Sequence, residues 1–186
     1  AWDTTPTVET EIKADTTFTY TYEKDLKEVT YPEGDKDSDG ELDDTTVNVQ
    51  VGKTITVDAG EGTWVPDDAS WTQNEDGTWT KTVTDDTEIK NEPTRNGYVF
   101  DGWEKTEDAD GNITLTAKWE KDENGDGIPD KYQKKITFKV VNGKWSDSTA
   151  ADKVYYVTLM TEGKWDENGS AAMPAVPVNM KANSGY

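Results

Sequence analysis

Two short acidic stretches have the residue types and the spacing of a cation-binding loop. Each carries oxygen-bearing side chains at its positions 1, 3 and 5 and a glycine at position 6, which permits a sharp turn that brings the carbonyl of position 7 inward. Ligands that offer only oxygen suit calcium, whereas zinc and copper favour nitrogen and sulfur. The candidate calcium ligands are Asp35, Asp37, Asp39, Glu41, Asp43 and Asp44 in the first stretch and Asp122, Asn124, Asp126, Ile128 and Asp130 in the second.

Both stretches depart from the full loop pattern at the same place. Thr46 and Gln133 occupy position 12, where a glutamate commonly binds calcium through both of its oxygens. Either Asp43, Asp44 and Asp130 substitute, or a neighbouring strand supplies a ligand. The competing interpretation is that both stretches are solvated acidic linkers. The presence of two such stretches, each beside a predicted β module, favours calcium.

The composition limits the classes of partner that this chain can have. Its 186 residues carry a formal net charge of −20 and include no cysteine. Phosphate groups would be repelled, so we expect no nucleic-acid partner. No apolar run approaches the roughly 20 residues of a membrane helix, so we expect no membrane insertion in this segment. We expect this segment to have been cut from a larger protein at Ala1.

Catalysis has little support in the sequence. The chain has neither histidine nor cysteine, so the commonest general base and the thiol nucleophile are both missing. Paired carboxylates can hydrolyse glycosides, but the acidic residues here are concentrated in the two loops. We therefore expect a protein that is not an enzyme.

Residues 96–122 predict a β-hairpin with an aromatic face. Apolar residues at alternate positions of the second arm give one buried and one solvated side, and Asp110-Gly111 supplies a turn. Threonine is frequent throughout, and no amphipathic helix longer than about two turns fits the 3.6-residue period. The fold class is therefore mainly β. The alternating apolar residues are Ile113, Leu115, Ala117 and Trp119.

Two parts of the chain recur. Thr114–Asp122 lines up with Thr17–Asp25, and Lys53–Trp64 aligns without a gap with Lys134–Trp145, with five of twelve positions identical. A repeat of this kind indicates two small modules. The expected units are a closing strand segment (1–25), an acidic connector (26–50), a β module (51–121), a second acidic connector (122–133) and a second β module (134–186).

The second module ends where the last hairpin of the first module begins, so residues 1–25 resemble its missing piece. The predicted strand Thr16–Tyr22 places Phe18, Tyr20 and Tyr22 on one face. Either the chain folds back on itself, or the strand completes the module of another copy and builds a head-to-tail filament. Neighbouring repeats of one long polypeptide would satisfy the same pattern. Stiffened connectors favour the intermolecular form.

Eight tryptophans allow two interpretations. Indole faces stack on sugar rings, which would suit a carbohydrate-binding module, but Trp64 and Trp145 occupy equivalent repeat positions, as do Trp103 and Trp2. Equivalent positions favour core packing, and we expect Trp64, Trp103 and Trp119 to be buried. Trp71 and Trp79 flank a turn, so the sequence does not decide whether these two residues are buried or exposed.

Residues 55–119 resemble the Listeria–Bacteroides repeat, the internalin B-repeat family, through Gly97-Tyr98-Val-Phe100-Asp-Gly102-Trp103 and Leu115-Thr-Ala117-Lys118-Trp119. The resemblance implies tandem β-grasp-like or β-sandwich-like modules in the stalks of bacterial surface proteins and adhesins. Glu104 replaces the tyrosine that is common after the tryptophan, which leaves the fold intact. The acidic loops resemble bacterial thrombospondin type 3 calcium repeats.

These features together predict a calcium-rigidified stalk or fibre segment of a repetitive, extracellular surface protein, of the Gram-positive type, attached to the cell wall or secreted. The expected partners are other copies or neighbouring repeats, and the sequence identifies no host or glycan ligand. The alternative is a carbohydrate-binding module of a secreted protein.

Overall fold

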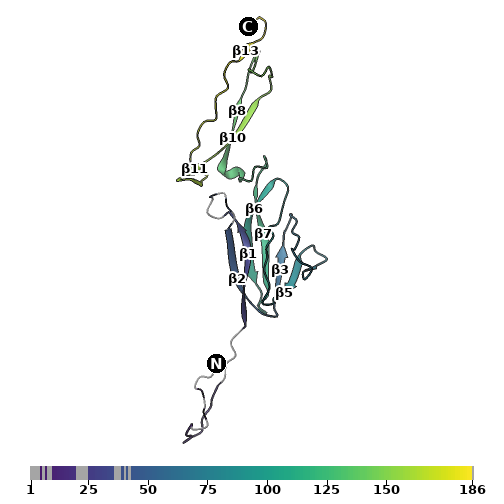
Figure 1. Cartoon of the computed structure of the whole chain (residues 1–186), viewed down its shortest axis with the longest axis vertical. Helices are drawn as coiled ribbons and strands as arrows, with labels where there is room; N and C mark the ends of the chain where they lie inside the picture. Colours follow the sequence, from purple (N-terminus) through teal and green to yellow (C-terminus); the bar gives the residue numbers. More distant parts are fainter. Residues whose placement is uncertain are drawn as a thin grey trace.

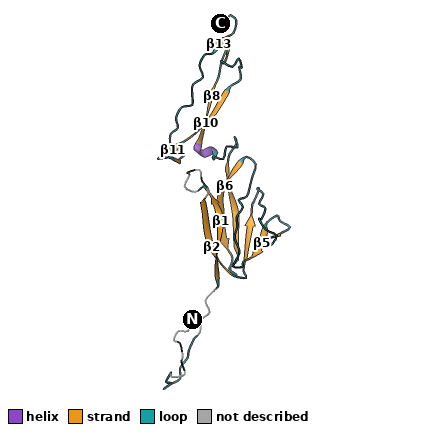
Figure 2. Ribbon diagram, in the orientation of Figure 1, coloured by secondary structure: helices purple, strands orange, loops and turns teal. Residues whose placement is uncertain are grey.

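The structure is a computed structural model, and it describes residues 5, 7, 10–19, 25–35, 39, 41 and 43–185. Over these residues the chain forms thirteen β-strands and a single 3-10 turn, η1 (Asp130–Tyr132), which confirms the mainly β prediction (Figure 2). The strands form a first unit (β1–β7) and a second unit (β8–β13) that lie end to end (Figure 1). In the described part, no helix has the length and apolar character that crossing a membrane requires.

A five-stranded sheet in the order β4-β5-β3-β7-β6 forms the centre of the first unit. Its central pair, β3 and β7, is parallel, with Ile55 opposite Ile113 and Val57 opposite Leu115, and the other pairs are antiparallel. Ile55, Val57 and Leu115 are fully buried, so the predicted alternation places one face of each strand in the core. The strands are β3 (Thr54–Asp58), β4 (Thr72–Gln73), β5 (Trp79–Thr82), β6 (Tyr98–Glu107) and β7 (Ile113–Lys121).

A long antiparallel ribbon, β1 (Leu26–Gly34) and β2 (Asp43–Gln50), packs on this sheet. The prediction that residues 26–50 form a connector is therefore wrong. Apolar residues at alternate positions of both strands enter the same core as the sheet, while mostly polar residues, among them Glu28 and Asn48, lie between them. The high acidic content of the segment concealed this alternation. The buried ribbon residues are Val29, Tyr31, Val47 and Val49.

The tryptophans of the first unit pack in or against the core, and the predicted burial is confirmed for Trp64 and Trp103 but only partly for Trp119. Trp64 and Trp103 are 3% and 6% exposed, and Trp119 is half-buried. Trp71 is buried as well, edge-on to Trp64 with ring centroids 4.9 Å apart, and Trp79 is half-buried against the same cluster. The indoles therefore contribute mainly buried area and edge-to-face contacts.

The second unit has short, paired strands and a sparse core. The strand β8 (Gln133–Phe138) pairs with β10 (Lys153–Thr158), β9 (Gly143–Lys144) with β13 (Lys181–Ala182), and β11 (Met160–Thr161) with β12 (Lys164–Trp165). Trp145 and Leu159 are the buried apolar residues among its described positions. A turn at Asp166–Gly169, closed by the Gly169 N–H donating to the Asp166 carbonyl at 2.9 Å, follows β12.

The predicted closing strand Thr16–Tyr22 is only partly within the described residues. Thr16–Thr19 form no strand here, and Tyr20 and Tyr22 lie outside the described residues. Residues 10–19 lie at the end of the first unit that faces away from the second unit (Figure 1). The described residues 10–19 therefore do not complete the second unit of their own chain in this structure.

Candidate functional site

The second acidic loop joins β7 to β8, and one buried carboxylate organises it. Asp122 is 4% exposed, and its side chain accepts the backbone N–H groups of Gly125, Asp126 and Gly127 at 2.8, 3.3 and 3.0 Å. Gly125 and Gly127 have φ angles of 72° and 85°, a left-handed conformation that glycine adopts without strain. The loop is therefore wound around the carboxylate at its first position.

Three further polar side chains of this loop converge. The Asn124 amide donates to Asp126 at 3.0 Å and to Gln133 at 3.2 Å, and the Gln133 amide donates to Asp126 at 2.7 Å. Gln133, at position 12, is 6% exposed, so burial of the β8 start fixes its side chain beside the loop. The predicted ligands Asn124 and Asp126 are thus brought together, with a glutamine that the sequence pattern had marked as a departure.

The last predicted residues of this loop take different roles. Asp130 begins η1, and its carboxylate accepts the backbone N–H of Glu123 at 3.2 and 3.3 Å. The backbone N–H of Ile128 donates to Asp126 at 3.1 Å. Asp130 therefore closes the loop by binding its beginning.

The chemistry of this loop fits calcium. Asp122, Asn124, Asp126 and Gln133 all carry side-chain oxygens within one short turn, which is the ligand type that calcium takes. Within the described part of the chain, no three or more acidic side chains are grouped so that they could hold a metal ion. Two of the four side chains named here, Asn124 and Gln133, are amides. Gln133 offers one oxygen where glutamate offers two, which favours weak binding.

The first acidic stretch is the tip of the β1–β2 ribbon and not a linker. Asp39 N–H donates to Asp35 at 3.1 Å, and Glu41 N–H donates to Asp39 at 2.8 Å. Asp43 and Asp44, predicted as ligands, lie in β2 opposite Gly34 and Pro32. Asp37 lies outside the described residues.

The ribbon brings this first loop to the end of the first unit that faces the second unit. Residues from both acidic loops line one cavity of about 240 Å³ between the two units. Sequence reasoning placed the loops about 80 residues apart on opposite sides of a module, and only the unexpected ribbon brings them together. The lining residues are Asp35, Glu92, Val99, Phe100, Asp101, Gly127, Pro129, Tyr132 and Trp165.

Other contacts cross the same joint. Lys131 forms an ion pair with Glu120 at 2.8 Å, which ties η1 to β7. The ring of Tyr132 lies 5.9 Å from that of Trp165, so η1 also contacts the second unit. The chain connecting the units is therefore held on both sides.

Glu92 is a partly buried acid that lines this cavity. Burial, and secondarily the negative charge of Asp44, raises the pKa of the Glu92 carboxyl above its ordinary value of 4.5. Its Oε1 is buried without a hydrogen-bond partner among the described residues. The charged form of Glu92 is thus disfavoured in the folded state.

We expect Glu92→Gln to stabilise the first unit near neutral pH. A carboxyl group with a raised folded-state pKa stabilises the fold at low pH, and this contribution is lost as pH rises from about 4.5 through the folded-state pKa. Urea unfolding at several pH values should show that the free energy of unfolding of the variant rises relative to that of the wild type over that pH interval. The exposed Glu75→Gln is the control, and parallel pH profiles for Glu92→Gln and the wild type would contradict the expectation.

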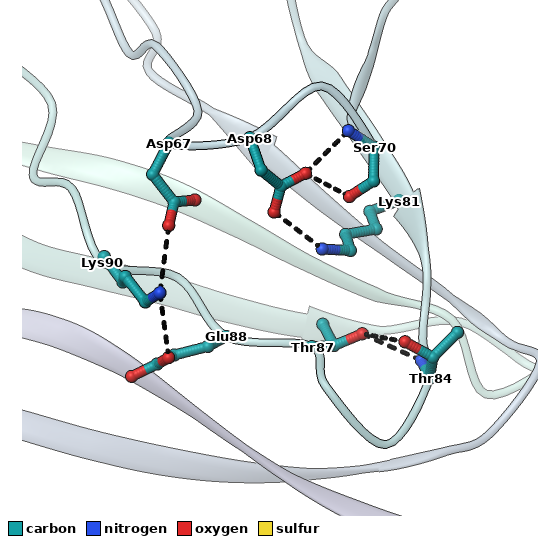
Figure 3. Close-up of polar contacts among 8 residues, drawn as sticks. All are labelled: Asp67, Asp68, Ser70, Lys81, Thr84, Thr87, Glu88 and Lys90. Carbon is teal, nitrogen blue, oxygen red and sulfur yellow. Dashed lines mark hydrogen bonds and ion pairs between the residues drawn. The ribbon is translucent and has the colours of Figure 1, made fainter.

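A second cavity is an open polar groove of about 630 Å³ on β4 and β5. Asp68 accepts the backbone N–H of Ser70 at 2.6 Å and pairs with Lys81 at 3.2 Å; hydrogen bonds from Ser70, with help from Lys81, lower the pKa of Asp68 to about 2. Lys90 lies between Asp67 and Glu88 (Figure 3). These polar groups partner one another, and the described residues that line the groove include no aromatic residue.

Comparison with protein-family models, with curated proteins and with solved structures found no match. The family resemblance of residues 55–119 and that of the acidic loops therefore stay predictions.

Proposed function

We propose that this chain is a non-enzymatic structural segment, a stiff spacer of a repetitive extracellular protein, and that calcium locks the joint between its two units. The observation that carries the proposal is the burial of Asp122 within a loop that joins the two units directly. A carboxylate wrapped by its own backbone, with further oxygen ligands beside it, lies where bending of the spacer would occur.

Electrostatics explains why such a joint would need a cation. Both acidic loops face it, and Glu92 and Asp101 line the same cavity. Charges of one sign at a joint repel and favour an open, mobile arrangement. Neutralising them would let the two units stay in line, as a spacer requires.

Calcium titration tests this proposal. Extracellular modules bind calcium at roughly 10⁻⁴–10⁻³ M, so at about millimolar calcium each site would contribute roughly 0.4–1.4 kcal/mol by mass action. Calorimetric titration of calcium into calcium-free protein should show about two sites. Removing calcium with EGTA should change the X-ray scattering profile to that of a mixture of more variable molecular shapes. Asp126→Ala should remove one site.

Asp166→Ala is the matched control, because Asp166 begins a similar acidic turn that lacks the loop spacing. It should leave the calorimetric heat unchanged. Absence of any heat, together with an identical scattering profile in EGTA, would overturn the proposal.

A carbohydrate-binding module is the second candidate. The observation that favours it is a cavity of about 250 Å³ where half-buried Trp79 lies beside Gln73 and Asp76. An aromatic ring beside polar side chains is typical of sugar sites. A glycan array and quenching of tryptophan fluorescence would detect binding, and Trp79→Ala should abolish it if this function is correct.

A further inference from the structure

The two units share a topology that extends beyond the aligned sequence. The antiparallel pairing of β8 with β10 matches that of β3 with β5. Ile136 and Ile55 occupy the same position in the aligned sequences, and they lie opposite Tyr155 of β10 and Lys81 of β5. Farther along, Lys144 pairs with Lys181 as Thr63 pairs with Thr94. The second unit therefore matches the first in these two pairings, as far as the bridge at Thr94 that precedes β6.

The match fails at one edge. In the first unit, β3 is paired on both sides, by β5 and by the parallel strand β7. In the second unit, β8 is paired only with β10 among the described residues. The edge that receives β7 in the first unit is thus open in the second. An open edge presents unpaired backbone groups that another strand can use.

The side chains around this edge are underburied. Ile55 and Val57 are fully buried, whereas the aligned Ile136 and Phe138 are only half-buried. Exposed apolar residues are concentrated in the same unit, although monomeric proteins rarely expose large contiguous apolar patches. The second unit therefore has the features of a core that lacks one covering strand. The exposed large apolar residues here are Val141, Val154, Met160, Met173, Val176, Val178 and Met180.

The repeat identifies the missing strand. Thr17, Phe18 and Thr19 align with Thr114, Leu115 and Thr116 of β7, and Leu115 is fully buried against β3. Phe18 is only half-buried in this chain. The charges also match: residues 1–25 have six acidic and two basic residues, whereas residues 134–186 have seven lysines and five acidic residues.

We propose that the N-terminal segment of a second copy of this chain adds to the open edge of β8 as a parallel strand. The register of β3 and β7 fixes the pairs: Thr17 lies opposite Thr137, Phe18 opposite Phe138 and Thr19 opposite Lys139. Each chain then offers a strand at one end and an acceptor at the other, so the contact is head-to-tail. The inference rests on the proposed structural role but not on calcium, so EGTA does not abolish the contact.

Engineered cysteines test this register, because the chain has none of its own. A tagged full-length Thr17→Cys chain, oxidised with an untagged Thr137→Cys chain, should form a disulfide-linked heterodimer. Val154→Cys is the matched acceptor control, since Val154 is exposed and lies directly opposite Thr137 on β10, one strand farther from the edge. Positions separated by more than about 7 Å are not bridged without backbone movement, so this pair should give little heterodimer.

A second pair of substitutions tests the N-terminal segment that is added to β8. In the Thr17→Cys chain, Phe18→Ser should abolish the heterodimer and Thr19→Ser should retain it, because only Phe18 would enter the core. Neither residue belongs to the core of the first unit, so both variants keep that unit folded. Equal yields with the Thr137 and Val154 partners would overturn the proposal. So would an internal disulfide in a Thr17→Cys/Thr137→Cys chain at high dilution, because that result places the strand on its own chain.

Discussion

Replacing Trp103 with alanine should lower the free energy of unfolding of the first unit by about 3–5 kcal/mol, the range for a large-to-small change in a packed core. Trp103 is 6% exposed, and its ring lies edge-on to Phe100 with centroids 5.0 Å apart. Its indole N–H donates to the carbonyl of Pro32 at 2.8 Å. One side chain therefore packs the sheet and ties it to the ribbon.

Chemical denaturation followed by far-ultraviolet circular dichroism measures this effect. Trp103→Phe keeps a ring in the core but loses the bond to Pro32, so its smaller cost should be about 1–3 kcal/mol. Val65→Ala, at a 61% exposed position, should change stability by no more than about 0.5 kcal/mol. If Trp103→Ala kept its midpoint but lost binding to a glycan, the carbohydrate-binding function would be favoured over core packing.

Asp122→Ala should destabilise the joint even in EGTA. The substitution leaves the N–H groups of Gly125, Asp126 and Gly127 without their acceptor, and loss of a hydrogen bond to a charged group costs about 1.5–3 kcal/mol. Hydrogen exchange of the loop amides should accelerate. Calcium binding at this loop should also be lost, because Asp122 is the first predicted ligand.

Asp122→Asn separates the two roles of this side chain. The amide oxygen still accepts a hydrogen bond, so exchange of the loop amides in EGTA should stay closer to wild type, whereas calcium affinity should fall with the lost charge. Asp85→Ala, an exposed acid outside both loops, is the control for net charge. Unchanged loop exchange in Asp122→Ala would show that the carboxylate does not hold the joint.

The sequence alone predicted the features that depend on residues close together along the chain. Alternation at Ile113, Leu115 and Ala117 indicated a strand with one buried face, and the buried residues confirm it. Repeat-equivalent tryptophans indicated core positions, and Trp64 and Trp145 are both 3% exposed. Local periodicity is sufficient for such predictions, because a strand alternates its side chains wherever it pairs.

Only the tertiary structure decided which strands share a core and where the acidic loops lie. Val29 and Val47 alternate with charged and polar residues, so their burial depends on a sheet contributed by residues much farther along the chain. That contact makes the first acidic stretch the tip of a ribbon and brings it to the same cavity as the second. The parallel pairing of β3 and β7 likewise joins segments whose separation along the chain carries no local signal.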